Sequence, residues 1–418
     1  MKKIVFVIIG FFNGGLERRV TNLSNELVKS GYSVEIAAVR GVSDTPFFEL
    51  DKRVKLVDIN EKQTTFRYVD FSEKKTSGAN APAAEVSALD HYEESSFKGN
   101  GLKKKIRKTA AFFIKNSILF RKANNSRYSA VYKDYFQKAS PDIVVSFGVN
   151  FHERVLSAAK GFDFKIFDAE INAHQSVIPQ DRVRRKSYFN LFKKVDGIIV
   201  QTQSEKEYFQ KKFKNIYVIN NPIKPDLPLA DKVKREKVIV NFCRITPQKN
   251  LSLLLEAFCR FHNEYPDYIL KIYGNVQQQM EIDEKNILVK RISELNISDC
   301  AFVLPPAPDV HKKIIDSAMY VSSSDFEGLS NSMLESMAIG LPCICTDCLG
   351  GGTREVMTDH ENGLIVPMND AEAMYRAMKE FIENPALAQK CSQNAMKIRE
   401  KLSVEKITRQ WLDVIENN

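Results

Sequence analysis

The sequence predicts an α/β protein of two doubly wound, Rossmann-like domains that face each other across a deep cleft. Strand-like and helix-like segments alternate along most of the chain, which is typical of parallel sheets with helices on both faces. A polar, charged stretch over 224–237 separates two such alternating units. A chain of 418 residues is also too long for one ordinary core, so two domains are expected.

The first alternating unit is expected to form the N-terminal domain, over 1–222. It opens on a short apolar run that resembles the start of a signal peptide. No small-residue cleavage site follows this run, so we interpret it as a buried first strand. A helix is expected over 16–29. The expected strands cover 4–9, 33–39, 54–59, 142–147, 165–168, 197–200 and 217–222.

An insertion over about 60–130 interrupts this unit. Between about 60 and 100 the residues are polar or small and show no period, which predicts a mobile excursion. Residues 101–127 then carry nine Lys or Arg and no Asp or Glu, interleaved with apolar residues. This composition predicts a basic amphipathic helix on an anionic membrane or acceptor, although an ordinary surface helix has a similar pattern. The residues expected at this contact are Lys103, Lys104, Lys105, Arg107, Lys108 and Lys115.

The second alternating unit, over 223–400, is expected to form the C-terminal domain. The expected helices cover 251–265, 279–295 and a segment from 310. The expected strands cover 237–242, 268–273, 301–304, 319–322, 342–346 and 364–367. Residues 401–418 are expected to form a C-terminal helix that could pack back on the first domain. The last helical segment is expected over 404–415.

Composition narrows the class of protein. Hydrophobic residues make up 44% and charged residues 27%, as in soluble globular proteins. No apolar segment reaches the ~18 residues that a membrane span needs. The net charge of +9 favours an anionic partner. Seven cysteines indicate no disulfide framework and fit a reducing cytoplasm. Cys343, Cys345 and Cys348 are close enough for a metal site, but they lie in a strand-like run and are better explained as packing residues.

Residues 326–335 hold two carboxylates, Glu327 and Glu335, around a predicted helix start. Ser330 or Asn331 suits the N-cap, which places Glu335 about one turn inside the helix. Free N–H groups at a helix start suit a phosphate, and a carboxylate suits sugar or ribose hydroxyls. The decapeptide therefore indicates a site for a sugar phosphate, with a solvated helix start as the alternative.

Two cations lie near the end of another predicted strand. Arg244 follows the strand over 237–242, and Lys249 precedes the next helix. Ligands of doubly wound sheets bind at the carboxyl ends of strands, so Arg244 and Lys249 are candidates to clamp a diphosphate. The alternative is a pair of solvated cations.

Glycines follow two predicted strands. Gly14 and Gly15 would let the backbone approach a ligand closely, as would the run over 350–352. Neither GxGxxG nor GxxxxGK[ST] is present, so the usual dinucleotide and P-loop sites are not supported.

Taken in order, these motifs resemble those of the retaining glycosyltransferases of family 4, which have the two-domain GT-B fold. The resemblance covers most of the chain apart from about 60–130. It is carried by the segments 14–18, 244–250, 327–335, 336–342 and 351–355.

The resemblance implies a nucleotide-sugar donor in the second domain, with UDP as the commonest nucleotide and GDP still open. Arg244 and Lys249 would neutralise the diphosphate, Glu327 would contact the transferred sugar, and Glu335 would take the ribose hydroxyls. Backbone N–H groups of Gly328, Leu329, Ser330 and Asn331 would meet the phosphates, and Gly14 and Gly15 would close over the donor. The implied displacement retains configuration and needs no metal or other cofactor.

The chain departs from the family at two places. Cys243 stands where a glycine is usual before the arginine. At the end of an N-domain strand, Glu170 matches the family pattern but Ile171 replaces an arginine, and His174 could orient the acceptor instead. Within this segment, Glu170 is the residue that we expect to take part in catalysis.

The most favoured function is a hexosyltransferase that extends a glycan or lipid-linked acceptor in cell-surface polysaccharide biosynthesis. It would be cytoplasmic and bound peripherally to the inner face of the plasma membrane of a bacterium. The alternatives are a soluble transferase that makes a small glycoside or sugar phosphate, and a non-catalytic GT-B partner subunit. Nucleic acid is not an expected partner, because the basic run lacks a recognition module.

Overall fold

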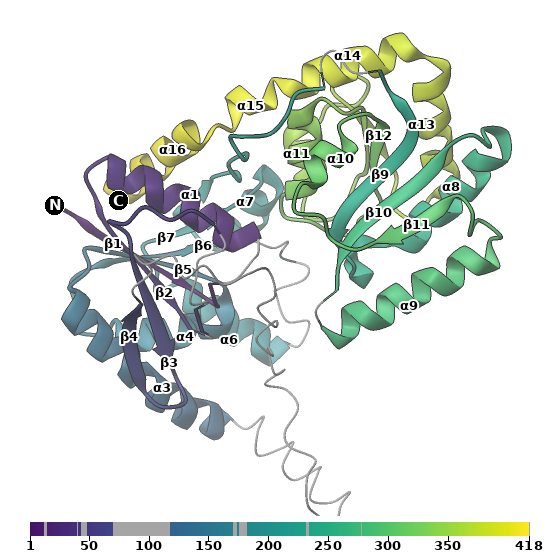
Figure 1. Cartoon of the computed structure of the whole chain (residues 1–418). Helices are drawn as coiled ribbons and strands as arrows, with labels where there is room; N and C mark the ends of the chain where they lie inside the picture. The colour runs from purple at the N-terminus through teal and green to yellow at the C-terminus, as the bar shows by residue number, and fades with distance from the viewer. Residues whose placement is uncertain are drawn as a thin grey trace, which may run out of the picture. The chain divides into compact units, whose positions relative to one another are not determined.

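The computed structural model describes residues 1–11, 15–39, 41–42, 48–69, 118–169, 174, 182–230, 234–276 and 278–417. The chain packs as two compact units, Met1–Lys165 and Ile166–Asn418. Its strands form two separate sheets, one of eight strands and one of six, as the sequence predicts for a doubly wound protein (Figure 1). The predicted domain boundary at 222/223 falls between the last strand of the first sheet and the first strand of the second. It stays a prediction, as does the packing of 401–418.

The first sheet has the strand order β4-β3-β2-β1-β5-β6-β7-β8. The apolar run at the start of the chain is indeed its central strand, because β1 pairs in parallel with both β2 and β5. The strands are β1 (Lys3–Ile8), β2 (Ser33–Ala38), β3 (Lys55–Asn60), β4 (Thr65–Val69), β5 (Ile143–Phe147), β6 (Lys165–Ala169), β7 (Gly197–Val200) and β8 (Ile216–Val218). The helices of this part are α1 (Gly15–Lys29), α3 (Ile118–Ala139), α4 (Val149–Ala158), α6 (Arg182–Phe192) and α7 (Gln203–Phe209).

Strand β4 corrects the expectation that regular structure stops near residue 60. It pairs antiparallel with β3, and the turn between them passes through Thr64 at φ 57°. Phe66 lies edge-on to Tyr135 of α3, and Arg67 contacts Asp58 at 3.2 Å. A five-residue edge strand with polar neighbours carries too little periodic signal to be read from sequence. Helix α3 covers the end of the basic stretch, but 101–117 lie outside the described residues.

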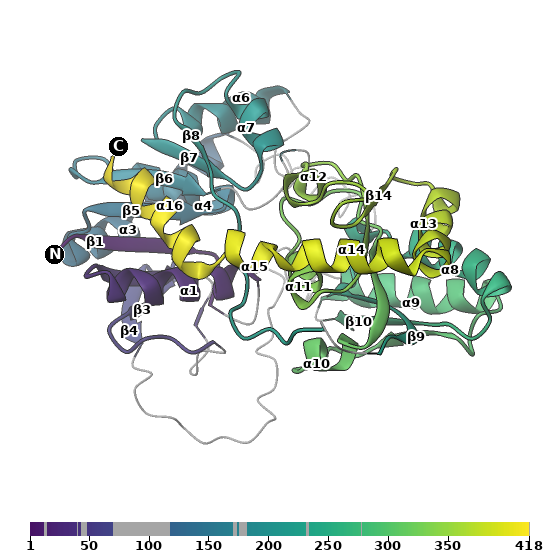
Figure 2. The ribbon, with the colours of Figure 1, turned by 90° about the horizontal axis from the view of Figure 1, so that it is seen from above.

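The second sheet is parallel throughout and has the order β11-β10-β9-β12-β13-β14. Its strands are β9 (Glu236–Arg244), β10 (Ile269–Asn275), β11 (Ala301–Leu304), β12 (Ser317–Ser322), β13 (Cys343–Thr346) and β14 (Leu364–Val366). Its helices are α8 (Leu251–Glu264), α9 (Gln279–Glu294), α10 (Val310–Ile314), α11 (Asn331–Ile339), α12 (Gly352–Val356) and α13 (Ala371–Glu383). The chain ends in α14 (Pro385–Met396), α15 (Ile398–Lys401) and α16 (Val404–Glu416), and Figure 2 shows α14 passing beside α11 and α13.

The polar segment between the two sheets is held to the second one by arginines. Arg235 donates to the carbonyls of Ile315 at 2.9 Å and Gly340 at 2.6 Å. Arg399 of α15 donates to the carbonyls of Leu227 at 2.6 Å and Pro228 at 2.7 Å. The bonds of Arg235 satisfy carbonyl groups at the ends of α10 and α11, and those of Arg399 satisfy carbonyl groups of the segment itself. This explains how a polar segment can be ordered.

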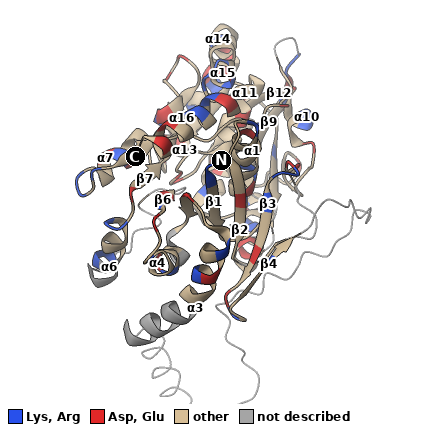
Figure 3. Cartoon of the chain, turned by 90° about the vertical axis from the view of Figure 1, so that its left-hand side faces the viewer, with Lys and Arg blue, Asp and Glu red and all other residues tan. Residues whose placement is uncertain are grey.

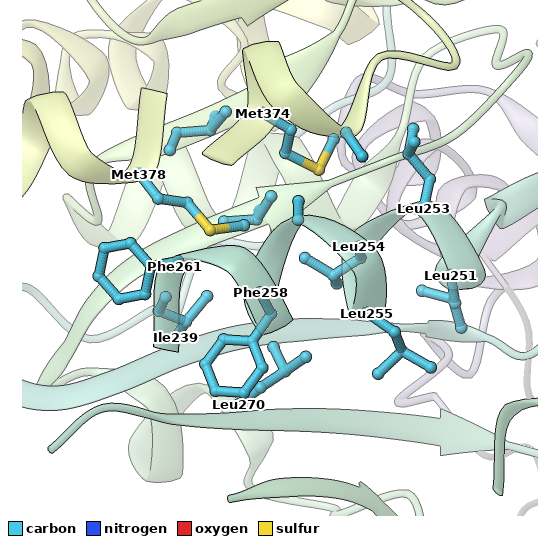
Figure 4. Packing of buried hydrophobic residues seen from close by; sticks show 14 of the residues in the cluster. Ile239, Leu251, Leu253, Leu254, Leu255, Phe258, Phe261, Leu270, Met374 and Met378 are labelled. Atoms are coloured by element: carbon cyan, nitrogen blue, oxygen red, sulfur yellow. The ribbon is translucent and has the colours of Figure 1, made fainter. Parts of the chain in front are cut away.

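Helices α8 and α13 pack together over the second sheet and enclose its main hydrophobic core (Figure 4). Leu254 and Phe258 of α8, Ile239 and Leu270 of the sheet, and Met374 of α13 are all fully buried. The buried residues of α8, such as Leu254 and Phe258, recur every three or four residues, which is the spacing of a helix with one buried face. The opposite face of the sheet carries Phe242 and Tyr320, whose rings contact each other at 5.6 Å.

Truncating this core is expected to destabilise the second unit. Leu254→Ala removes a fully buried side chain, so the free energy of unfolding should fall by about 2–5 kcal/mol. Urea unfolding followed by circular dichroism measures this loss. Met280→Ala on α9 is the matched control, because Met280 is 53% exposed and its truncation should leave stability nearly unchanged. Equal effects of the two variants would contradict the assignment of this core.

Within the described part of the chain, no helix is long and apolar enough to cross a bilayer. Lys and Arg are spread over several elements, α6 and α7 among them (Figure 3).

Candidate functional site

The predicted diphosphate and sugar residues lie at the carboxyl ends of neighbouring strands. Arg244 is the last residue of β9, and its side chain is exposed. Lys249 ends a single 3₁₀ turn, η1 (Pro247–Lys249), between β9 and α8. Glu327 follows β12, which pairs directly with β9, on the loop before α11. The topology therefore brings together residues that are 78 positions apart in the chain.

Lys249 and Glu327 form an ion pair between Nζ and Oε1, and each side chain is 13% exposed. Glu327 Oε1 also accepts a hydrogen bond from Ser324 Oγ at 3.1 Å. Burial alone would lower the pKa of Lys249, but the carboxylate of Glu327 outweighs burial and the pKa is raised. Lys249 therefore stays protonated at neutral pH and presents a fixed positive charge.

The backbone around Lys249 is fastened to the loop that carries Glu327. Asn250 has a left-handed conformation, φ 43° and ψ 48°, and its amide donates to Asp325 Oδ1 at 2.8 Å. The side-chain amide of Gln248 donates to the carbonyl of Phe326 at 2.6 Å, and the backbone carbonyl of Gln248 accepts from the N–H of Asp325 at 2.9 Å. Ser323 Oγ donates to the carbonyl of Lys249 at 2.9 Å. These four links hold the cation and the carboxylate in one geometry.

Helix α11 begins where the sequence predicts. Ser330 is its N-cap, although its hydroxyl contacts Ser332 Oγ at 3.1 Å and does not cap the helix backbone. The first N–H groups of α11 are therefore not taken by a capping side chain, and they point the positive end of the helix dipole out of its start. Glu335 lies one turn inside, and Gly340, at φ 90°, ends the helix.

The glycine run over 350–352 packs against the backbone that precedes α11. A Cβ on Gly352 would lie 2.0 Å from the carbonyl oxygen of Gly328, so only glycine fits there. Thr353 Oγ1 donates to the carbonyl of Thr346 at 2.8 Å and fixes the start of α12 below this contact. Gly352 therefore permits a close approach between two backbones.

Residues after β7 and β8 also reach this loop within the second compact unit. Asn221 donates to the carbonyl of Leu329 and to Asn331 Oδ1, both at 3.2 Å. Gln201 orients Asn221 through a hydrogen bond of 2.9 Å. Thr202 Oγ1 donates to the carbonyl of Gly350 at 2.8 Å. The loop over 328–331 is thus supported from two sides.

Glu335, the predicted ribose ligand, is 5% exposed and pairs with a residue that no sequence motif singles out. Its Oε2 lies 2.7 Å from Nε2 of His311, which belongs to α10 and is 9% exposed. The ring of Phe242 meets the imidazole edge-to-face with a centroid distance of 5.8 Å.

His174 is described, whereas Glu170 lies outside the described residues. The imidazole of His174 stacks on Tyr208 with a centroid distance of 3.6 Å, and its Nδ1 lies 2.9 Å from Glu205 Oε1. The backbone N–H of His174 donates to the other oxygen of Glu205 at 3.0 Å. Glu205 therefore fixes both the backbone and the ring of His174, which is an ordered residue of the second unit.

Several other predicted residues are not placed by the structure. Gly14 and the six basic residues over 103–115 lie outside the described part, and Gly15 is the first residue of α1. Among the described residues, no group of three or more His, Cys, Asp or Glu is arranged to hold a metal ion. Cys343 and Cys345 are buried strand residues of β13. In β9, burial raises the pKa of the Cys243 thiol to about 11.

Comparisons with known proteins bear on the family and the fold of this chain. Residues 229–398 match the family model described as "Glycosyl transferases group 1". An uncharacterized glycosyltransferase of Haemophilus influenzae is 26% identical over 419 residues, which cover 99% of this chain and 100% of that protein. The poly(ribitol-phosphate) alpha-N-acetylglucosaminyltransferase of Staphylococcus aureus is 26% identical over 228 residues, which cover 54% of this chain but only 44% of that protein.

Solved structures with the same architecture cover the whole chain. TarM superposes with a TM-score of 0.73 at 16% identity, over 99% of each chain. The sucrose-phosphate synthase of Thermosynechococcus elongatus superposes with a TM-score of 0.72 at 15% identity, over 100% of this chain and 99% of that one. At such identities the likeness concerns the fold. The family match places residues 229–398 among the group 1 glycosyltransferases, family GT4, and the structures of similar fold give the chain the two-domain GT-B architecture.

Proposed function

We propose that this glycosyltransferase takes its sugar from a UDP-sugar, held by the loops around Lys249 and Glu327. The observation that carries the proposal is the partly buried Lys249–Glu327 pair beside the start of α11. A lysine that stays protonated, next to N–H groups at a helix start, suits a diphosphate. Among proteins of similar fold, TarM of S. aureus has been solved with UDP, and HepE of Anabaena with UDP and glucose.

The roles of the residues are those that the family resemblance implies, and the chemistry of each side chain suits its role. Arg244 and Lys249 neutralise the diphosphate, and the N–H groups of 328–331 bind its oxygens. Glu327 contacts the transferred sugar, and Glu335 accepts the ribose hydroxyls. Gly14 and Glu170, which lie outside the described residues, remain proposed contributors, as does Gly15 at the start of α1.

The reaction is a displacement on the face of the sugar that the diphosphate leaves. The bond between the anomeric carbon and the diphosphate oxygen breaks, and a bond from the acceptor oxygen to the same carbon forms. The acceptor proton passes to an oxygen of the departing phosphate, so atoms and charge balance. The protein positions the partners and stabilises the negative charge on the leaving group, and the configuration at the anomeric carbon is retained.

A donor screen tests the proposal. Turnover and nucleotide release are measured with a panel of UDP- and GDP-sugars, for the native chain and for Glu327→Ala and Arg244→Ala. We expect turnover with a UDP-sugar and a loss of about 100-fold or more in each variant. Wild-type turnover in both variants would remove the site assignment. Absence of any nucleotide binding by the native chain would favour a non-catalytic partner subunit.

The acceptor is proposed to be a glycan or lipid-linked chain of a bacterial cell-surface polysaccharide, reached at the cytoplasmic face of the membrane. Two relatives support this class by name: the S. aureus enzyme above, and the poly(glycerol-phosphate) alpha-glucosyltransferase of Bacillus subtilis. The stretch over 101–127, with nine basic and no acidic residues, supports contact with an anionic surface.

Flotation with anionic liposomes tests the membrane contact. The full chain should float, and replacing Lys103, Lys104, Lys105, Arg107, Lys108 and Lys115 by Gln should abolish flotation while donor hydrolysis continues. A matched set of six Lys→Gln changes on the second unit controls for net charge. Equal flotation of all three proteins would remove the argument for contact through 101–127, and a full chain that does not float would favour a soluble transferase that makes a small glycoside or sugar phosphate.

A further inference from the structure

The pair formed by Glu335 and His311 is not explained by any role assigned so far. Both residues lie in the second unit, on the face of the sheet that α10 and α11 cover, and the Nε2–Oε2 distance is 2.7 Å. The His311 side chain is 11% exposed and the Glu335 side chain is 6% exposed. A buried carboxylate is costly unless it is hydrogen-bonded, so the bond to the imidazole offsets part of the cost of burying Glu335.

The imidazole is itself held in position. Phe242 of β9 meets its ring at 87°, and Phe242 packs in turn on Tyr320 of β12. Tyr320 Oη donates to Ser332 Oγ at 3.0 Å, within the first turn of α11. The elements that frame the pair are therefore β9, β12, α10 and α11.

The geometry has a consequence for ligand recognition. A carboxylate can accept about four hydrogen bonds, and the bond to His311 uses one site on Oε2. The same bond fixes the rotation of the carboxylate plane. A vicinal diol needs a carboxylate whose plane is fixed, because both hydroxyls must donate at once. Residues that orient a ligand-binding group typically change affinity by tens of fold when they are removed.

We propose that His311 is a positioning residue that orients Glu335 toward the ribose diol of the donor nucleotide. It thereby sets the preference of the enzyme for ribonucleotides over their deoxy forms. This inference rests on the proposed role of Glu335. It adds a residue that touches the carboxylate rather than the ligand, and whose effect is confined to the ribose.

The test compares the affinity of the full chain for UDP and for 2′,3′-dideoxy-UDP by calorimetry, with GDP and 2′,3′-dideoxy-GDP measured in parallel. The readout is the dissociation constant of the dideoxy nucleotide divided by that of the ribonucleotide, because a general loss of stability changes both constants alike. His311→Phe keeps an aromatic ring against Phe242 but removes the donor to Glu335. We expect the native ratio to fall by about tenfold or more in this variant and in Glu335→Ala.

His311→Gln can still donate through its amide, so we expect it to retain a higher ratio than His311→Phe. It also serves if His311→Phe folds poorly. His262→Phe is the matched control, because His262 is a partly buried histidine of α8 whose Nδ1 lies 3.0 Å from a backbone carbonyl oxygen. It should keep the native ratio.

The outcomes separate the two claims. If Glu335→Ala lowers the ratio and both His311 variants keep it, His311 has no positioning role and the inference is overturned. If Glu335→Ala keeps the native ratio, or if the native chain shows no preference for ribose, the proposed role of Glu335 fails and this inference fails with it.

Discussion

Replacement of Lys249 by alanine is expected to lower kcat/KM for the sugar donor by about 10²–10³-fold. The Lys249 side chain is 13% exposed, and its positive charge is paired with the carboxylate of Glu327. Negative charge grows on the diphosphate as its bond to the sugar breaks, and removing one preorganised stabilising group costs about this much. The expected loss is therefore in turnover, with a smaller loss in nucleotide affinity. Steady-state kinetics at saturating acceptor, together with UDP and UMP titrations, measure both.

Two further variants show where the loss comes from. Lys249→Ala leaves Glu327 without its cation, so part of any effect could be a loss of stability. The double variant Lys249→Ala with Glu327→Gln removes the unpaired carboxylate and should restore the Tm without restoring turnover. Lys237→Ala is the matched control, since Lys237 lies near the other end of β9, is 58% exposed and pairs with Asp267. Turnover of Lys249→Ala within twofold of this control would contradict the role of Lys249.

Much of the fold could be predicted from the sequence, and the reason is physical. Strands such as β1 and β9 are buried on both faces of a parallel sheet, so they appear as continuous apolar runs that stand out from their neighbours. Helix α8 repeats its apolar residues every three or four positions over 14 residues. Strand β4 was missed because an exposed edge strand of five residues needs no such pattern.

The site was predictable only in part. Arg244, Lys249 and Glu327 each follow a strand, and residues at strand ends carry a local signal. His311 carries none: it precedes Glu335 by 24 residues on a five-residue helix, and only the packing of α10 beside α11 brings the two together. The same holds for Asn250, which has a left-handed conformation and whose side chain donates to the distant Asp325.

Gly352→Ala is expected to damage both stability and nucleotide binding. The new Cβ would lie 2.0 Å from the carbonyl oxygen of Gly328 and 3.3 Å from Cα of Leu329. Both obstacles are backbone atoms, so no side chain can rotate away and the loop before α11 must move. Such overpacking typically costs about 1–3 kcal/mol of stability. The displaced N–H groups of 328–331 should weaken UDP binding by about tenfold or more.

Gly197→Ala provides the comparison that separates this effect from the general cost of a methyl group. At Gly197 the new Cβ would meet only side-chain ring atoms, of Tyr217 at 2.9 Å and of Phe167 at 3.0 Å. These rings can shift by a few tenths of an ångström, so the loss of Tm should be smaller. Thermal unfolding and UDP titration of both variants are the measurements. If Gly352→Ala lowers the Tm but leaves UDP affinity at the native value, the 328–331 loop does not bind the diphosphate. The close approach of Gly352 to Gly328 would then serve the fold alone.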